Sequence, residues 1–532
     1  MELNETVVPK TTKSQWIQFS ALVFGAFIAI EAMAFQAPAI PVIAAHFEVP
    51  SHLAGLIVLS FYIVSASLYP ITGRLADKHG RKRVLLIGIG IFAIAEFAAA
   101  VSPTFSFLLV ARVFQGVGVS CIFPIVIAYI GIIFQPEQRG IASGIFNSVQ
   151  AVAAMLGAGL AGFLVKVYGW PIIYWISGVL AVAGFLVVLF FIKESKGVVK
   201  GSMDFVGILL LFVTTACILS VSTLVGQFGI ASPYTLGTLA TGVLAAALLW
   251  FFGNRIPNPL IELSLLKKRV FALAALGYLT FTAALQLFIY SMSFFLTSRP
   301  GGDVAETGLF FMFNSGAAAI GGVIIGKLAD KVNNKKLLIC TLIIPTTALL
   351  IFSRIDASTS TSYILLLAAF FGVGTAIPIF FKYALNVIPT DKYGAGSGLL
   401  SVIRDFGAPL GSVTGIVLFT KFSLSAQQNS LTSQAAAAGV NPDLMGAVQQ
   451  AGNSGGKVID GALATELQTL GIRFEELMAT ALGEGATMGI QNMSLIVASL
   501  FASIIVLSLF LPQKKAVKEQ PVVTTHAEEN LV

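Results

Sequence analysis

The chain has 532 residues, of which 56% are hydrophobic and only 11% are charged. A soluble globular protein carries roughly a quarter charged residues, so most of the surface of this protein must face something other than water. Lys and Arg exceed Asp and Glu by seven charges, and the three scattered cysteines form neither a disulfide framework nor a metal-ligand set.

The apolar residues form blocks long enough to cross a bilayer, which takes about 20 residues of helix. Fourteen blocks follow one another along the chain, near residues 17–44, 53–72, 84–101, 105–134, 140–165, 172–192, 205–224, 234–253, 270–296, 307–325, 337–353, 361–388, 394–420 and 490–511. Backbone groups inside lipid must bond within their own segment, so we expect each block to be a helix. The sequence therefore predicts an all-α polytopic protein that crosses the lipid bilayer fourteen times.

Basic residues are concentrated in one set of connecting segments. They occur in the N-terminal segment, in 74–83, 193–200, 255–269 and 327–336, and in the C-terminal tail. The positive-inside rule places these segments, and with them both termini, on the cytoplasmic side. The positive charge is thus explained by topology in a bacterial cytoplasmic or inner membrane, and we expect no nucleic-acid partner.

The chain contains an internal repeat. Residues 73–86 read GRLADKHGRKRVLL and residues 326–339 read GKLADKVNNKKLLI, so that half of the aligned positions are identical. Both copies join two apolar blocks. A repeat at equivalent points of the topology predicts two related halves of six helices each, as in many secondary transporters.

This repeat predicts a division of the chain into five parts. They are an N-terminal cytoplasmic tail (1–13), a first six-helix bundle (14–193), two additional helices with their linkers (194–266), a second six-helix bundle (267–512) and a cytoplasmic tail (513–532). The second bundle carries a polar insert at 421–489, which we expect outside the cell. Residues 458–482 of this insert favour short amphipathic helices, and the sequence does not identify a partner for it.

Two segments resemble signatures of the major facilitator superfamily. Residues 73–85 resemble its motif between helices 2 and 3, and residues 108–120, LLVARVFQGVGVS, resemble its helix-4 motif. The segments Asp204–Gly207, Pro259–Leu263 and Arg404–Gly407 resemble those of the fourteen-span drug:proton antiporter family. The resemblance implies the major facilitator fold, two six-helix bundles with two extra central helices, and a secondary transporter that is not an enzyme and needs no cofactor.

Two departures from the family pattern leave the direction of transport and the substrate open. Antiporters of this kind carry a Gly-Pro pair in helix 5, whereas residues 157–162 read GAGLAG. The helix-1 pattern of the family has an Asp, whereas this chain has Glu31 shifted by about one position.

An ionisable residue inside a bilayer costs several kcal/mol, so each one requires a reason. Glu31 lies near the middle of the first apolar block, where a carboxylate removed from water can hold a proton and release it when a cation arrives. We therefore interpret Glu31 as a proton-coupling or substrate-binding residue. The alternative is an acid neutralised by hydrogen bonds at a helix interface.

Arg112 and Gln115 lie three residues apart, on one face of the fourth apolar block. An arginine cannot lose its charge, so a buried one must be paired or hydrated. The resemblance implies a role for Arg112 in proton coupling. A purely structural pairing is the alternative.

Arg404 and Asp405 are adjacent in the thirteenth block, and we expect their side chains to point about 100° apart without facing one another. Arg404 shares a face with three glycines, so it is expected to meet a partner from a closely packed neighbouring helix. Asp405 is a candidate for the central cavity. Together with Glu31 and Arg112, we interpret Gln115, Arg404 and Asp405 as proton-coupling or substrate-binding residues. Lys382 is interpreted either as a residue at the cytoplasmic end of a span or as a counter-ion, and Glu96 is set aside because helix 3 is often peripheral in the superfamily.

The first copy of the repeat carries Gly73, Asp77, Gly80 and Arg81 in a short connecting segment. Asp77 is able to accept hydrogen bonds from a helix N-terminus or to pair with Arg81. By resemblance this cluster is a conformational latch, and Asp330 repeats its acidic residue in the second copy. The alternative is a set of charges that serves topology alone.

These observations predict a proton-coupled exporter of lipophilic, cationic small molecules, with protons and the substrate as its small partners. No phosphate-binding loop of the G-x-x-x-x-G-K-[S/T] kind occurs, so coupling to ATP is not expected. Two alternatives stay open. One is a proton-coupled transporter of a specific metabolite or siderophore, and the other is a membrane interaction or sensing protein that does not transport.

Overall fold

The computed structural model describes most of the chain. The described residues are 12–195, 204–253, 255, 262–329, 332–355, 357, 359–374, 376–385, 387–388, 393–453 and 460–512. Within these ranges the regular elements are helices, and no strand occurs among them. This confirms the predicted all-α class.

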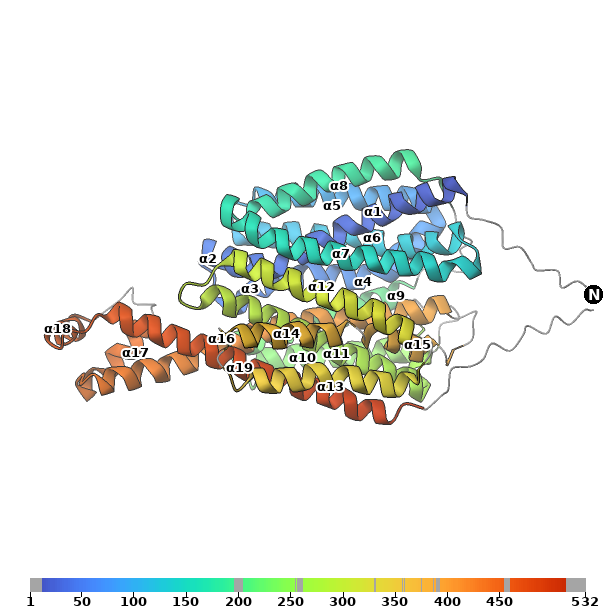
Figure 1. Cartoon of the computed structure of the whole chain (residues 1–532). Coiled ribbons are helices and arrows are strands. Elements are labelled where there is room, and N and C mark those ends of the chain that lie inside the picture. Colours follow the sequence, from blue (N-terminus) through green and yellow to red (C-terminus); the bar gives the residue numbers. More distant parts are fainter. Residues whose placement is uncertain are drawn as a thin grey trace, which may run out of the picture.

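The long helices form one elongated bundle (Figure 1). They are α1 (Lys13–Ala34), α4 (Leu56–His79), α5 (Arg81–Ala100), α6 (Phe105–Ile133), α7 (Pro136–Tyr168), α8 (Pro171–Phe191), α9 (Phe205–Phe228), α10 (Pro233–Gly253), α11 (Arg269–Ser298), α12 (Val304–Ala329), α13 (Asn334–Phe352), α16 (Tyr393–Ala437) and α19 (Phe474–Leu509). Shorter helices are α2 (Gln36–His46), α3 (Ser51–Ala54), α14 (Ser360–Val373), α15 (Ala376–Leu385), α17 (Met445–Asn453) and α18 (Gly461–Thr469).

Twelve helices of the described chain are long and apolar enough to cross a membrane. The two other predicted crossings, at 307–325 and 361–388, coincide with α12 and with α14 followed by α15, and both lie alongside the other helices of the bundle (Figure 1). The fourteen-crossing topology itself stays a prediction.

The first predicted block, 17–44, is not one continuous helix. The structure has α1 up to Ala34, a turn residue at Phe35, and then α2. Pro38 explains the break, because its ring nitrogen has no hydrogen to donate to the carbonyl of residue 34. The helical hydrogen-bond pattern is thus interrupted at Phe35, four residues after Glu31, while the backbone of Phe35 itself stays in the helical region.

The predicted insert, 421–489, is not a loop region with isolated helices. The last two crossings continue beyond the bundle, α16 for 45 residues in all and α19 for 36. Together with α17 and α18 they form a helical projection, which we call the arm (Figure 1). Apolar side chains of the arm, such as Leu431, Leu463 and Phe474, form a small core of their own. The short helices expected at 458–482 correspond to α18 and the start of α19. The continuation of both crossings into the arm was not predicted, because the arm's polar composition conceals its helical periodicity.

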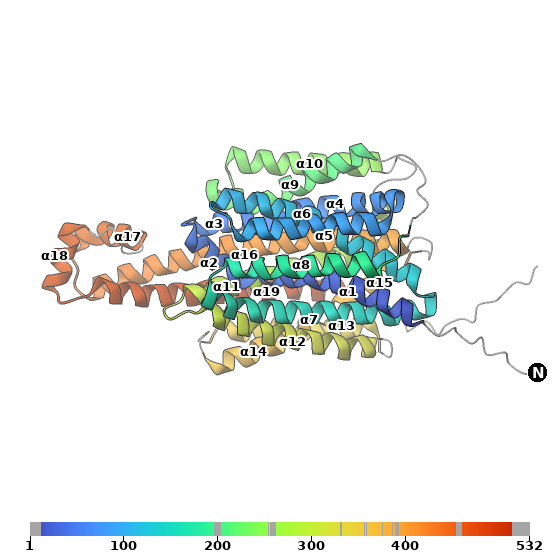
Figure 2. The ribbon, with the colours of Figure 1, turned by 90° about the horizontal axis from the view of Figure 1, so that it is seen from above.

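The arm defines two ends of the bundle. We call the end that carries the arm, α2 and α3 the arm end, and the opposite end, where α1 begins and α4 meets α5, the loop end (Figures 1 and 2). Helices α1 and α4–α8 pack on one another, as do α11–α16 and α19, whereas α10 packs mainly on α9. Figure 2 shows α10 at the outer edge of the bundle, with α9 beneath it.

The predicted close approach of another helix to the glycine-rich face of α16 is confirmed. At Gly411 an added Cβ atom would lie 2.0 Å from the carbonyl oxygen of Ala283 on α11, so only glycine fits without movement of the helices. This contact holds two long helices of the second half together.

We expect Gly411→Ala to destabilise the protein by about 1–3 kcal/mol, because the extra methyl group forces α11 and α16 apart. Thermal unfolding in detergent measures this as a lower midpoint temperature. Gly131→Ala is the matched control, since no atom lies within 4 Å of a Cβ at that position. Equal midpoints for the two variants would contradict the close contact.

Candidate functional site

Arg112 on α6 lies at the centre of a buried polar region in the first half. Its Nε atom donates a hydrogen bond to the carbonyl oxygen of Ile57 (3.0 Å), and Nη1 donates to Oε1 of Gln115 (2.6 Å). The guanidinium carbon lies 4.7 Å from the ring centre of Phe61. Arg112 and Gln115 are both buried, so the predicted pair on one face of α6 is a direct hydrogen-bonded contact.

Two buried carboxylates accompany this arginine. Glu31 on α1 is 3% exposed and Glu96 on α5 is 1% exposed. Each has a carboxylate oxygen that lacks a hydrogen-bond partner among the described residues. Glu96 interacts electrostatically with both Arg112 and Glu31. We call Glu31, Glu96, Arg112 and Gln115 the N-half charge cluster; it contains two acids and one permanent positive charge.

Further polar groups surround the cluster on α2 and α8. The hydroxyl of Tyr174 donates a hydrogen bond to Oε1 of Gln36 (3.1 Å), and both side chains are buried. Tyr174 interacts electrostatically with Arg112 and Glu96, and Ser177 lies next to Glu31. Sequence reasoning did not single out Gln36 or Tyr174, because uncharged polar residues are common in membrane helices.

Glu96 was set aside in the sequence analysis, whereas the structure places it with Arg112 and Glu31. The general rule that an intramembrane carboxylate needs a reason would have selected it, because Glu31 and Glu96 are the two acids within the predicted spans of the first half. The argument used against Glu96, that helix 3 is often peripheral in the superfamily, was weaker than this rule.

Arg404 and Asp405 form an ion pair on α16. The Nε atom of Arg404 lies 2.7 Å from Oδ1 of Asp405, so the expectation that adjacent residues would not face one another is wrong. The long arginine side chain folds back and reaches its neighbour, although the two Cβ atoms diverge. Tyr278 on α11 also interacts with Arg404, as expected of a partner on the closely packed helix.

The two members of this pair differ in exposure. The side chain of Asp405 is 5% exposed, whereas that of Arg404 is 38% exposed. The pair also interacts with three tyrosines, which are Tyr278 beside Arg404 and Tyr62 and Tyr69 on α4. Tyr62 interacts in addition with Arg112. Tyr62 thus links the N-half charge cluster to the ion pair of the second half.

The two halves touch each other at the arm end. Lys166 of α7 forms an ion pair with Asp303, which precedes α12, and the hydroxyl of Ser293 on α11 donates a hydrogen bond to the carbonyl oxygen of Ala37 on α2. Helices α7 and α12 approach most closely at Gly162 and Gly308. These contacts close the arm end of the interface between the halves.

The structure corrects the placement of the loop-end motif. Residues 73–79 form the last turns of α4, and Gly80 alone separates α4 from α5. Oδ1 of Asp77 lies 2.6 Å from Nη2 of Arg81, and Arg81 also donates a hydrogen bond to Oγ of Ser195 (3.1 Å). Asp77 therefore pairs with Arg81, which was one of the two expected arrangements. Asp330, the counterpart in the repeat, lies outside the described residues.

The other expected arrangement, an acid at a helix N-terminus, is made by a different residue. The carboxylate of Glu194 accepts hydrogen bonds from the backbone N–H groups of Lys82 (3.0 Å) and Arg83 (3.3 Å) at the start of α5. An anion at this position is favoured by the partial positive charge of the helix terminus. The segment after α8 is thereby attached to the loop-end motif.

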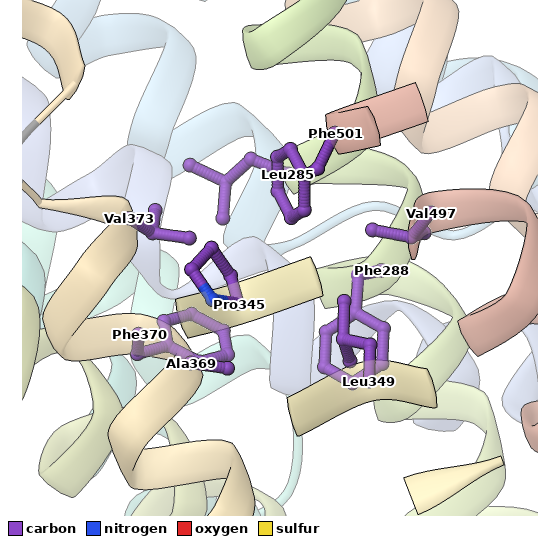
Figure 3. Close-up of a pocket in the computed structure, with 9 residues that line it drawn as sticks. All are labelled: Leu285, Phe288, Pro345, Leu349, Ala369, Phe370, Val373, Val497 and Phe501. Atoms are coloured by element: carbon purple, nitrogen blue, oxygen red, sulfur yellow. The ribbon is translucent and has the colours of Figure 1, made fainter. Parts of the chain in front are cut away.

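A small apolar cavity lies within the second half. Figure 3 shows its lining by Leu285, Phe288, Pro345, Leu349, Ala369, Phe370, Val373, Val497 and Phe501. These residues come from α11, α13, α14 and α19 and include no ionisable side chain. The lining of the cavity therefore offers no group that would recognise a charge.

Comparison with known proteins agrees with this architecture. The sequence profile of the Major Facilitator Superfamily matches residues 22–412, and the chain belongs to this family of membrane transporters. It is 27% identical over 387 residues to the multidrug resistance protein Stp of Mycobacterium tuberculosis, covering 71% of each chain. It is 23% identical over 413 residues to the MFS-type transporter YhcA of Bacillus subtilis, covering 77% of this chain and 78% of that protein.

Solved structures resemble the fold at low sequence identity. A bacterial homologue of the human lysosomal transporter Spinster, in an inward-facing and unoccupied conformation, has a TM-score of 0.61 at 15% identity. The match covers 94% of this chain and 98% of that one. The chain is therefore a multi-pass membrane transporter with the major facilitator fold, and it is not an enzyme.

We expect Asp303→Asn to weaken the closure of the arm end, because the Lys166 ammonium loses its anionic partner. The pair is exposed, so the ratio of open to closed states should change only about two- to fivefold, the equivalent of at most about 1 kcal/mol. Distances between spin labels at Tyr168 and Arg354, exposed positions in the two halves near the arm end, measure this population. An unchanged distance distribution relative to Arg473→Met, which breaks an ion pair within the arm, would contradict the expectation.

The same pair predicts a pH dependence. The hydrogen bond from Lys166, followed by the backbone N–H of Ala305, lowers the pKa of Asp303 below its usual value. A depressed pKa means that the stabilisation is present above the usual Asp value of about 4 and is lost as the pH falls through the lowered pKa. Spin-label distances should therefore show the pair's contribution unchanged between neutral pH and about pH 5. A loss within that range would contradict the assignment to Asp303.

Proposed function

We propose that this protein is a proton-coupled secondary transporter that exports lipophilic, cationic small molecules by alternating access. The observation that carries the proposal is the N-half charge cluster, in which two buried acids accompany one arginine. Relatives named as multidrug resistance proteins, at 27% and 23% identity, support the substrate class.

The charge balance of the cluster supports proton coupling. Arg112 retains its positive charge, so one ionised carboxylate neutralises it, and a second ionised carboxylate would leave an uncompensated buried charge. One of Glu31 and Glu96 therefore carries a proton while the cluster is closed to water. Access of water or of a substrate cation favours release of that proton, which couples proton movement to substrate binding.

The contacts between the halves support a conformation that is closed at the arm end. With both termini cytoplasmic, as the charge distribution of the sequence predicts, the loop end faces the cytoplasm and this conformation is inward-facing. Arg404, partly exposed although its neighbours Asp405 and Tyr278 are buried, is accessible to a substrate that enters from that side. A substrate bound near Asp405 would then affect Arg112 through Tyr62, which interacts with both residues.

A narrow-specificity alternative has one observation in its favour. Residues 157–162 lack the Gly-Pro pair of the antiporter pattern, and Gly157 packs against the backbone of Glu31. The helix next to the proposed coupling acid thus departs from the antiporter pattern. A proton-coupled transporter of a metabolite or siderophore would fit this departure, and the efflux experiment below separates the two functions.

We expect cells that express the protein to export ethidium only while a proton gradient exists, and Glu31→Gln to abolish this export. The amide removes the titratable oxygen but retains the shape of the side chain, so expression should be unaffected. Fluorescence of cells loaded with ethidium, with and without a protonophore, measures efflux. Glu475→Gln, an exposed acid of the arm, is the matched control.

The outcomes of this experiment separate the proposals. Gradient-dependent efflux that survives Glu31→Gln but is lost in Glu96→Gln would transfer the coupling role to Glu96. Efflux that survives both substitutions would remove the cluster from coupling. No efflux from a correctly inserted protein would favour the transporter of a specific metabolite, to be sought by an uptake screen.

We expect Asp77→Ala to reduce the maximal rate of transport about two- to fivefold, with little change in the substrate concentration at half-maximal rate. The substitution removes an ion pair at the loop end, whose loss is worth about 0.5–1 kcal/mol, and leaves the buried charge clusters unaltered. Concentration-dependent transport in proteoliposomes measures both quantities. Asp443→Ala, in the arm, is the matched control. A change in apparent affinity alone, or equal rates for the two variants, would exclude a role of Asp77 as a conformational latch.

A further inference from the structure

We propose that α9 is a clamp that holds the two halves together along one side of the bundle and stabilises the conformation closed at the arm end. This inference rests on the two-half architecture of the family and not on the proposed substrate. It assigns a role to the additional pair α9 and α10, which lies outside the two six-helix halves and contributes no residue to the charge clusters.

The position of α9 is the first argument. It packs on α4 of the first half and on α16 of the second half, whereas α10 packs mainly on α9 and lies at the outer edge of the bundle (Figure 2). Leu219 of α9 is fully buried in an apolar cluster with Leu59 of α4 and with Val413 and Val417 of α16. A side chain of α9 thus belongs to an apolar cluster that joins both halves where they meet.

A polar contact reinforces this apolar cluster. The hydroxyl oxygens of Ser222 on α9 and Thr414 on α16 lie 2.7 Å apart and share a hydrogen bond. Ser222 follows Leu219 by three residues, and Thr414 follows Val413, so both contacts lie at the same level of the helices. A hydrogen bond between side chains of two membrane helices contributes directly to their association, because neither group can turn to water.

The composition of α9 is the second argument. Its buried face carries Leu211, Thr215, Leu219 and Thr223, spaced at intervals of four residues, while Leu209 and Phe212 are exposed. A helix that only fills lipid-facing space needs no hydroxyl groups on its inner face. The inward Ser and Thr residues of α9 suit a helix that associates through small and polar side chains.

The consequence concerns the movement of the halves. When the arm end opens, α4 and α16 must separate, and α9 cannot remain packed on both. The contacts of Leu219 and Ser222 must therefore break on one side in each cycle. Because these contacts exist only while the halves are together, they shift the equilibrium toward the closed arm end.

The test uses the full-length protein in lipid nanodiscs without any substrate, so that it does not depend on the proposed function. Spin labels at Tyr168 and Arg354 report the distance between the halves at the arm end. We expect Ser222→Ala to increase the ratio of open to closed populations about threefold, the equivalent of one interhelical hydrogen bond in a membrane protein. Leu219→Ala should produce a larger shift in the same direction.

Thr241→Ala is the matched control, because the Thr241 hydroxyl on α10 donates only to a carbonyl oxygen of its own helix. The proposal would be overturned if Ser222→Ala and Leu219→Ala gave the same distance distribution as Thr241→Ala.

Discussion

The buried guanidinium of Arg112 is the constraint on which the rest of the first half depends. A group that keeps its charge inside a membrane protein needs hydrogen-bond acceptors and a compensating negative charge. The carbonyl of Ile57 and the amide of Gln115 supply the acceptors, and Glu31 and Glu96 supply more negative charge than one arginine requires. In the proposed function this excess acid is the group that holds a proton.

The contacts that join the halves are both polar and apolar. The exposed pair of Lys166 and Asp303 is a polar one. The apolar contacts are continuous with the interiors of both halves, because one cluster of buried side chains includes Ile57 and Ala158 of the first half and Phe288 of the second. Movement of the halves relative to each other must therefore rearrange apolar packing as well as polar contacts.

Helix α16 connects features that the sequence presents separately. It carries the ion pair of Arg404 and Asp405, packs on α11 through Gly411, and contacts α9 through Thr414. Beyond the bundle the same helix continues into the arm (Figure 1). A rotation of α16 would thus reach the charge pair, the clamp and the arm together, because a continuous helix transmits displacement along its length.

The sequence by itself determined the class of the protein and most of its helices. Because every backbone group in lipid must bond within its own segment, an apolar block such as 105–134 corresponds closely to α6, Phe105–Ile133. The motifs around Asp77 and Arg112 pointed correctly to the family. Only the tertiary structure brought Glu96 to Arg112, folded Arg404 onto Asp405 and laid α9 against both α4 and α16. Those arrangements depend on which helix faces pack together and on the reach of long side chains, and neither is encoded in the local periodicity from which helices are predicted.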